Sequence, residues 1–502
     1  MGESGLAEVA GVVGAAGAVL VLLAGRRATL LTGLAALAAA EVLLAEPGGV
    51  SPALAAAGVG GLLVLAAGAA FFVRYPTLVI PALLLAAPFR LPFDFDRDHR
   101  FLFALAQGGK LGRLVPLYVV LAAATGAYAW RVGRGATVTP VVRLLALPAA
   151  AFFALASLSL VWSRDFDSGA NLLAFFLLPF AALVAVVARA ELAPWLPKAL
   201  AWISIGLGSL FAAVGLWQEL TQDLFFYSPQ LEVANAYSPF FRVTSLFTDP
   251  SLYGRHVVLG FAVLLVLIWT DRINVYLGTA VGALLFAGLY FSYSQTSMAS
   301  LFVVAFVVTL IAGDRVARRS VVAATAVFLL AAAVPLLVGA KGHSISDVTS
   351  GRWARVERTA DVVREAPLLG VGLGAQPEAS QDLAEQSRAR TARFVSHTTP
   401  LTVAAELGVV GLAVYLLLLS ATVRMILILR RRDFALALAL GAALLALFVH
   451  ALAYSGFFED PITWLALGIG AAYLAAPVPA REPARETATK NPAPAGHPIP
   501  AK

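Results

Sequence analysis

Residues 401–419 read LTVAAELGVVGLAVYLLLL, a run of apolar side chains interrupted by one charge, that of Glu406. An α-helix of about 20 predominantly apolar residues crosses the roughly 30 Å of hydrocarbon in a bilayer. Comparable runs recur along the whole chain. The sequence therefore predicts an all-α fold, a polytopic transmembrane helical bundle.

The composition supports this prediction and excludes a soluble enzyme. Of the 502 residues, 60% are hydrophobic and only 13% are charged, whereas about 25% of the residues of a soluble domain are charged. The chain has no cysteine, which excludes disulfides, cysteine-ligated zinc, iron–sulfur clusters and thiol nucleophiles. The net charge of +7 is explained by the basic cytoplasmic loops of membrane proteins, so we expect no nucleic-acid partner.

The apolar runs mark about 15 candidate spans, so we expect about 14–15 helices that cross the membrane. One of the runs, 76–90, is short and contains Pro81 and Pro88, which predicts a broken or re-entrant segment. The candidate spans are 6–25, 28–45, 53–73, 76–90, 114–130, 144–162, 169–188, 199–218, 252–270, 275–292, 297–312, 321–339, 400–421, 434–454 and 461–476.

Basic residues mark every second loop, and such loops lie in the cytoplasm. This pattern predicts an N-terminus outside and a C-terminus inside. Two of the outside loops, 219–251 and 340–399, are long, and loops longer than about 15 residues are usually functional or disordered. The basic clusters are Arg26-Arg27, Arg74, Arg131/Arg134/Arg143, Arg189/Lys198, Arg272, Arg315/Arg318/Arg319 and Arg430-Arg431-Arg432.

Three regions follow from this topology. N-terminal transmembrane helices occupy residues 1–218, and residues 219–476 contain the transmembrane helices with both long extracytoplasmic loops. The Pro- and Ala-rich segment 477–502 has too few apolar residues for a core and is expected to be a disordered cytoplasmic tail. We expect the function in the second region, because loops positioned by a rigid scaffold carry function.

The long loop 340–399 contains several short motifs. Gly351-Arg352 is followed by Pro367-Leu-Leu-Gly-Val-Gly-Leu-Gly374, and Ser396-His397-Thr398-Thr399-Pro400 directly precedes the span quoted above. The glycine spacing superficially resembles a nucleotide-binding loop, but no strand precedes it and no acidic partner follows about 20 residues later. We therefore interpret this segment as a tight turn.

These motifs resemble those of the O-antigen ligase and O-antigen polymerase family of bacterial polytopic membrane glycosyltransferases. The family combines Gly-Arg, a Pro-hydrophobic-Gly-x-Gly segment, a loop histidine and a span with Glu-x-Gly-x-x-Gly. In this chain they correspond to Gly351-Arg352, Pro367–Gly374, His397 and Glu406-Leu-Gly408-Val-Val-Gly411. Two upstream segments, Arg242-Val-Thr-Ser-Leu-Phe247-Thr-Asp249-Pro250 and Ser292-Tyr-Ser-Gln-Thr-Ser297, resemble further family motifs.

The resemblance implies a glycosyltransferase of surface polysaccharide biosynthesis in the cell envelope. Its active site would lie on the extracytoplasmic face of the bacterial plasma (inner) membrane, where nucleotide sugars are absent. The donor would be a glycan on undecaprenyl diphosphate, and the acceptor a hydroxyl of a glycan or a lipid. Direct attack at the anomeric carbon implies inversion, and we expect neither a metal nor another cofactor. The motifs leave ligation and polymerisation open.

The candidate site residues come from the same motifs. Arg242 and Arg352 are the candidate diphosphate ligands, with Arg255 as a third, because a guanidinium binds phosphate oxygens bidentately and stays charged. For each of them the alternative is an arginine that snorkels to the interface. His397 is the candidate catalytic base, since histidine titrates near neutral pH. Glu406 is expected either to form a structural ion pair or to orient His397 or an arginine.

Two other functions stay open. Asp94 and Asp96 have the D-x-D spacing with which two carboxylates share a divalent cation, as in another class of lipid-donor glycosyltransferases. The interleaved Arg97 favours a solvated loop, so we expect no metal site there. The second alternative is a transporter or flippase of lipid-linked glycans, but such proteins show repeated halves and paired broken helices, and the sequence shows neither.

Overall fold

The computed structural model describes residues 3–44, 52–89, 114–226, 229–339, 352–386, 396, 398–454, 456 and 458–477. Within these ranges the chain forms helices and no strands, which confirms the predicted all-α fold. Short helical turns at Pro76–Leu78, Ser159–Trp162 and Leu173–Leu177 join neighbouring helices. The α-helices are α1 (Glu3–Leu23), α2 (Arg27–Leu44), α3 (Pro52–Arg74), α4 (Val79–Ala86), α5 (Val115–Gly133), α6 (Arg143–Leu158), α7 (Phe166–Leu172), α8 (Leu178–Val187), α9 (Leu196–Thr221), α10 (Pro229–Tyr237), α11 (Pro250–Trp269), α12 (Val275–Phe291), α13 (Gln295–Ala312), α14 (Arg315–Gly339), α16 (Arg352–Glu365), α17 (Gln376–Gln386), α18 (Thr399–Leu429), α19 (Phe434–Ala451) and α20 (Pro461–Ala475).

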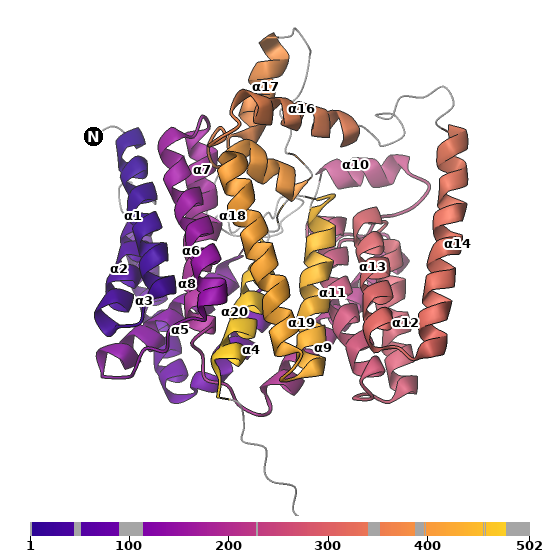
Figure 1. The fold of residues 1–502 in the computed structure, drawn as a ribbon, viewed down its shortest axis with the longest axis horizontal. Helices are drawn as coiled ribbons and strands as arrows, with labels where there is room; N and C mark the ends of the chain where they lie inside the picture. Colours follow the sequence, from indigo (N-terminus) through magenta and orange to yellow (C-terminus); the bar gives the residue numbers. More distant parts are fainter. Residues whose placement is uncertain are drawn as a thin grey trace, which may run out of the picture.

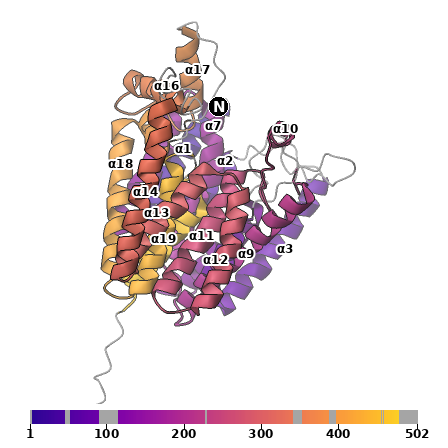
Figure 2. The same cartoon turned by 90° about the vertical axis from the view of Figure 1, so that its right-hand side faces the viewer.

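The long helices stand side by side, and α16 and α17 lie beyond one end of them (Figure 1). We call this end, marked by α16 and α17, the loop end. The opposite end, where Arg189 and Arg430 follow α8 and α18, we call the basic end. After a turn of 90°, α10 is also seen at the loop end, on the side away from the start of α18 (Figure 2). Several segments that carry the sequence motifs therefore gather at one end of the bundle.

Ten of the described helices are long and apolar enough to cross a bilayer, so the chain is a multi-pass membrane protein. α3 and the helical segment Pro76–Ala86, which includes α4, form a bent pair with an angle of 111°. The bend lies at Tyr75, before the predicted segment 76–90, whereas Pro81 lies inside the helical part of α4. α12 and α20 are apolar but shorter, and α14 covers the predicted span 321–339. The ten helices are Gly5–Leu23, Arg27–Leu44, Val115–Gly133, Arg143–Trp162, Phe166–Val187, Leu196–Thr221, Pro250–Trp269, Gln295–Ala312, Thr399–Leu429 and Phe434–Ala451.

A buried arginine ties three connections together at the basic end. Arg189 donates from Nε to the carbonyl oxygen of Thr139 (2.8 Å), from Nη1 to that of Ala185 (3.0 Å) and from Nη2 to that of Ala24 (3.0 Å). Burial lowers the pKa of Arg189 to about 10, and the three acceptors compensate part of the cost of desolvating the guanidinium. The α1–α2, α5–α6 and α8–α9 connections therefore meet at one place.

Aromatic side chains fill the space between α6 and α20. Trp464 is fully buried, its ring centroid lies 4.4 Å from that of Phe153, and its Nε1 donates to the carbonyl oxygen of Phe458 (2.9 Å). Phe458 in turn stacks on Phe152, with centroids 4.1 Å apart. Aromatic burial with the indole N–H satisfied is strongly stabilising. This packing fixes the turn before α20, which carries Asp460.

Two predicted segments, the loop 91–113 and the tail 477–502 apart from its first residue, fall outside the described residues. Of the loop 340–399, residues 340–351, 387–395 and 397 fall outside them. The division of the chain at residue 218 and the character of the tail stay predictions.

Candidate functional site

α18 is broken near its start. Gly408 has φ +66° and ψ −167° inside the helix, a backbone conformation that favours glycine because it has no Cβ atom. At such a break the flanking carbonyl and amide groups lose their helical partners and need others. The Glu406-Leu-Gly408-Val-Val-Gly411 motif thus marks the place where backbone amide and carbonyl groups of this span can form hydrogen bonds with another segment.

The segment Pro367–Gly374 occupies the break. The amide of Gly372 donates to the carbonyl oxygen of Glu406 (2.9 Å), and the amide of Val409 donates to that of Pro367 (2.8 Å). Buried backbone groups are almost always paired, and here the two segments satisfy each other. Two motifs that the sequence shows separately therefore form one structural unit.

The glycines of this segment allow a close approach of the two backbones. Gly370, Gly372 and Gly374 have positive φ angles of 71°, 94° and 76°. A Cβ atom at Gly370 would overlap the backbone of α18, and one at Gly408 would overlap the carbonyl oxygen of Leu368. The predicted tight turn is confirmed, and its glycine spacing reflects packing against α18.

The connection between α6 and α7 holds the same segment from another side. Ser163 Oγ donates to the carbonyl oxygen of Leu373 (2.9 Å), whose amide donates to Ser159 Oγ (3.1 Å). Arg164 forms an ion pair with Glu365 at the end of α16 (2.9 Å). The segment is thus fixed between α18 and the α6–α7 connection, and it positions α16 and α17 on either side of it.

The candidate base His397 lies outside the described residues, but both of its neighbours are described. The amide of Ser396 donates to Oε1 of Gln376 on α17 (2.8 Å). Oγ1 of Thr398 donates to the carbonyl oxygen of Leu452, just after α19 (3.2 Å). α17 and the end of α19 therefore fix Ser396 and Thr398.

Two further predicted residues belong to this unit. Arg352 is the first residue of α16, and its side chain lies outside the described part of the structure. Glu406 lies two residues before the break in α18 and is 8% exposed. A buried carboxylate needs an ionic or hydrogen-bonding partner. Both predicted roles of Glu406, an ion pair and the orientation of a neighbouring group, provide one.

Arg242 lies between α10 and α11 at the loop end. Its amide donates to Oδ1 of Asn235 (3.0 Å), and Nδ2 of Asn235 donates to its carbonyl oxygen (3.2 Å). Its Nε is buried and has no hydrogen-bond partner among the described residues. A buried donor without a partner is costly, so this nitrogen is well suited to an anionic ligand.

Gln218 of α9 organises the residues that follow Arg242. Its side chain is fully buried, Oε1 accepts from the amides of Thr244 (3.0 Å) and Ser245 (2.6 Å), and Nε2 donates to the carbonyl oxygen of Ser245 (3.1 Å). Ser245 has a positive φ of 53°, which is uncommon for a residue other than glycine. The sequence reasoning missed Gln218, although a polar side chain in an apolar span is a signal for a special role.

The Asp249-Pro250 pair starts α11. Oδ1 of Asp249 accepts from the amides of Ser251 (2.7 Å) and Leu252 (3.0 Å), as an N-cap residue does. A proline in the first turn suits a helix start, because its missing N–H has no helical acceptor there. This part of the motif is thus explained by helix capping.

One turn further along α11, Arg255 forms a buried ion pair with Asp460, the N-cap residue of α20 (2.9 Å). Their side chains are 5% and 0% exposed. Nε2 of His450 on α19 lies 3.2 Å from the carbonyl oxygen of Ser251 in the same part of α11. This cluster joins α11, α19 and α20. The sequence reasoning missed Asp460, although an aspartate before Pro461 and an apolar run is a helix-start signal.

The predicted site residues fall into two described groups. The Pro367–Gly374 and Glu406–Gly411 motifs contact each other directly, and Arg352 begins the helix that leads into the first of them. Arg242 and Arg255 lie on the two sides of the α11 cap. Asp94 and Asp96 lie outside the described residues.

Residues 280–416 match the family model described as O-antigen ligase. The matched stretch begins within α12, ends within α18 and includes Arg352, His397 and the two motifs that meet at the break. Arg242 and Arg255 precede it. A comparison with curated proteins gave no match. The chain is therefore a multi-pass membrane protein in which residues 280–416 are similar to the O-antigen ligase family.

Proposed function

We propose that the chain is a glycosyltransferase that transfers a glycan from undecaprenyl diphosphate to an acceptor hydroxyl outside the bacterial plasma membrane. Its product would belong to a cell-envelope polysaccharide. The observation that carries the proposal is the O-antigen ligase match over residues 280–416. The docking of Pro367–Gly374 into the broken α18 supports it, because sites need a rigid supporting structure.

The distribution of charge supports an extracytoplasmic site. Arg189 and the run Arg430-Arg431-Arg432 follow α8 and α18 at the basic end. Basic loops face the cytoplasm, so the loop end with α16 and α17 faces outward in this proposal. Because nucleotide sugars are absent there, the glycosyl donor has to arrive on a lipid.

In the proposed reaction the acceptor hydroxyl attacks the anomeric carbon of the donor sugar. The bond from that carbon to the diphosphate oxygen breaks while the bond to the acceptor oxygen forms, so the anomeric configuration inverts. His397 accepts the proton of the hydroxyl. Undecaprenyl diphosphate leaves with the bonding electron pair.

Arginines stabilise the charge of the leaving diphosphate in this proposal. Arg242 suits this role, since its buried Nε has no partner among the described residues, and Arg352 is its counterpart at the start of α16. Arg255 is already paired with Asp460. We therefore place Arg255, together with Glu406, in support of the site rather than on the diphosphate.

The test uses the full chain in lipid nanodiscs with undecaprenyl-diphosphate-linked oligosaccharide as donor. We expect glycan transfer in the presence of EDTA, a loss of at least about 100-fold in His397→Ala and normal transfer in Asp96→Ala. A ladder of glycan lengths identifies a polymerase, whereas one addition to a different acceptor identifies a ligase.

Two outcomes would contradict the proposal. Transfer that requires a divalent cation and survives His397→Ala would establish the metal-dependent class with Asp94 and Asp96. Movement of intact lipid-linked glycan across a vesicle membrane by the His397→Ala protein, with no transfer by the wild type, would establish a flippase.

A further inference from the structure

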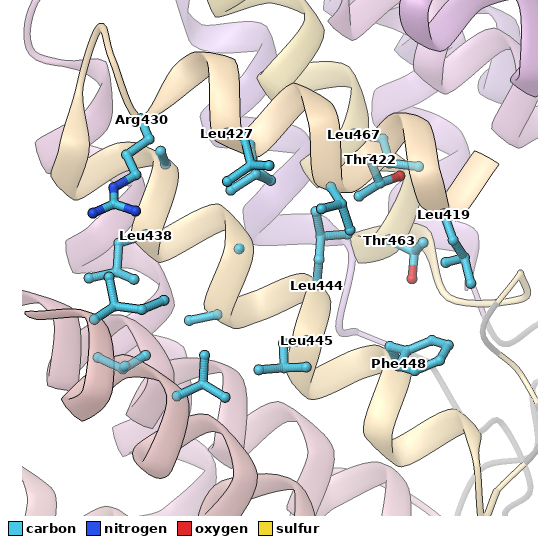
Figure 3. Close-up of a pocket in the computed structure, with 18 of the residues that line it drawn as sticks. Leu419, Thr422, Leu427, Arg430, Leu438, Leu444, Leu445, Phe448, Thr463 and Leu467 are labelled. Atoms are coloured by element: carbon cyan, nitrogen blue, oxygen red, sulfur yellow. The ribbon is translucent and has the colours of Figure 1, made fainter. Parts of the chain in front are cut away.

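A groove of about 420 Å³ lies between α13, α18, α19 and α20. Apart from two threonines and Arg430, its lining side chains are apolar, and Leu427, Leu445 and Phe448 are among them (Figure 3). Its volume falls in the range of about 300–1,000 Å³ that is typical of ligand sites. The groove is therefore large enough for a ligand, and its lining suits hydrocarbon.

The groove opens toward the surroundings of the bundle. Val423 and Leu427 line it and are 59% and 55% exposed, whereas Thr463 and Trp464 line it and are fully buried. An empty gap with apolar walls would lose the dispersion contacts of those walls, and a dry apolar cavity takes up apolar ligands. In a bilayer, the acyl chain of a neighbouring lipid is available to fill the groove.

One end of the groove carries a positive charge. Figure 3 shows Arg430 at that end and Phe448 and Thr463 at the other. The guanidinium carbon of Arg430 lies 5.5 Å from the ring centroid of Phe434, which also lines the groove. A guanidinium at the mouth of an apolar groove complements a phosphate that is linked to a hydrocarbon chain.

The two neighbouring arginines have different surroundings. Nη1 of Arg432 donates to three carbonyl oxygens at the end of α20, among them that of Leu474 (2.9 Å). Arg431 is exposed and does not line the groove. Arg430 is thus the member of this run that lines the groove, and Arg431 provides a matched control.

Arg430 is far from the candidate active site. It follows the last residue of α18, and the part of α18 beyond Gly408 is about 30 Å long at 1.5 Å per residue. A phosphate at Arg430 therefore belongs to a lipid of the leaflet at the basic end. It is not the diphosphate of a donor at the loop end.

We propose that this groove binds a membrane phospholipid with an anionic headgroup. The headgroup phosphate contacts Arg430, and one acyl chain extends along the groove toward Phe448. The chain supplies packing contacts between α13, α18 and α19 that the side chains leave unfilled. The bound lipid thereby steadies α18, whose other end carries the break at Gly408.

The first test measures lipid binding to the purified, delipidated full chain by native mass spectrometry. The probes are phosphatidylglycerol, phosphatidylcholine with the same acyl chains, and undecaprenyl phosphate. We expect phosphatidylglycerol to bind about five- to tenfold more tightly than phosphatidylcholine, since one arginine near anionic lipid contributes about 1 kcal/mol. Arg430→Gln removes this preference and Arg431→Gln keeps it.

The second test locates the lipid with a phosphatidylglycerol that carries a photoactivatable group at the end of one acyl chain. We expect labelling of peptides from α13, α18, α19 or α20. Gly441→Leu is expected to reduce the labelling, because the leucine side chain would occupy the groove. A Cβ atom added at Gly441 lies 3.2 Å from Cγ2 of Ile426, which also lines the groove.

Several outcomes would overturn the site. Equal loss of the preference in Arg430→Gln and Arg431→Gln would show a diffuse attraction to the basic loop, and labelling on other helices would place the lipid elsewhere. Tighter binding of undecaprenyl phosphate than of phosphatidylglycerol would show that the groove binds a polyprenyl chain instead of a phospholipid. None of these measurements depends on glycan transfer, so the lipid site and the proposed function fail separately.

Discussion

The ion pair between Arg255 and Asp460 shows how much one residue can do in this bundle. Asp460 neutralises Arg255 at 2.9 Å and also caps α20, because its Oδ1 accepts from the amide of Ile462 (2.8 Å). A buried pair gains little over an apolar pair of the same shape, but the loss of one partner leaves an uncompensated charge. The pair is therefore best examined by removing one charge and keeping the cap.

Asp460→Asn makes that change, because asparagine is a good N-cap residue. We expect the free energy of unfolding to fall by about 3–5 kcal/mol, since Arg255 stays charged and buried. Thermal unfolding in detergent micelles measures the effect. The control, Glu365→Gln, breaks the half-exposed pair with Arg164 and is expected to cost less than about 1 kcal/mol. An Asp460→Asn protein as stable as this control would contradict the structural role of the pair.

At the scale of elements, α18 consists of two helical parts that are joined at Gly408 and depend on the segment docked between them. Its exposed apolar side chains face outward, as those of any span do, and its break is satisfied by Pro367–Gly374. The span and the loop are thus stabilised together. Damage to either is expected to release the other.

Gly408→Ala tests this dependence. The added Cβ atom would overlap the carbonyl oxygen of Leu368. The backbone conformation of Gly408, φ +66° and ψ −167°, is essentially restricted to glycine and costs about 1–3 kcal/mol for a residue with a Cβ atom. We expect faster hydrogen exchange at the amides of Val371 and Gly372. Gly206→Ala on α9 is the control, because nothing lies within 4 Å of its added Cβ atom, and it should leave those amides protected. Unchanged exchange in Gly408→Ala would mean that the segment docks independently of the break.

At the basic end, Arg189 connects three parts of the chain, because it donates hydrogen bonds to carbonyl oxygens in each of them. In Arg189→Lys the single ammonium group cannot reach all three, so buried carbonyl groups lose their donors. We expect a loss of about 1–3 kcal/mol, measured as a lower midpoint of thermal unfolding. Arg134→Lys is the control, because Arg134 is held against the ring of Trp130 and donates to no buried carbonyl in the described residues.

The contribution of Arg189 to the stability of the wild-type chain should not depend on pH near neutrality. Burial lowers the pKa of Arg189 to about 10 from 12.5, so the unfolded chain binds more protons than the folded chain only between these two values. Stability rises with pH in that window alone. At pH values from about 6 to 9 both states of the wild-type chain are protonated at Arg189. A pH-dependent cost of Arg189→Lys in this range would therefore reflect titration of the introduced lysine, whose pKa burial lowers.

At the scale of the whole molecule, the sequence predicted what depends on local hydropathy. The spans were visible because each is a continuous apolar run. The bend was expected within 76–90 because of Pro81 and Pro88, but it lies at Tyr75, between two predicted spans. The break at Gly408 was not visible, because it lies inside an apolar run that contains no proline and it depends on a segment that docks from elsewhere. The pairing of Arg255 with Asp460 was missed because the two residues are far apart in the sequence and meet only when α11 packs against the start of α20. The roles of His397, Arg242 and Arg352 stay predictions.

The orientation of the bundle decides whether the donor must be a lipid, and the chain is well suited to measuring it. Because the chain has no cysteine, one introduced cysteine is a unique label. Glu385→Cys is at an exposed position on α17 at the loop end, and Arg431→Cys is at an exposed position at the basic end. The reagent is a membrane-impermeant maleimide, applied to intact cells or, where an outer membrane is present, to spheroplasts. It should label Glu385→Cys at once and Arg431→Cys only after lysis, because basic loops face the cytoplasm. The reverse pattern would put the loop end in the cytoplasm, where nucleotide sugars are present, and would remove the physical reason for an undecaprenyl-linked donor.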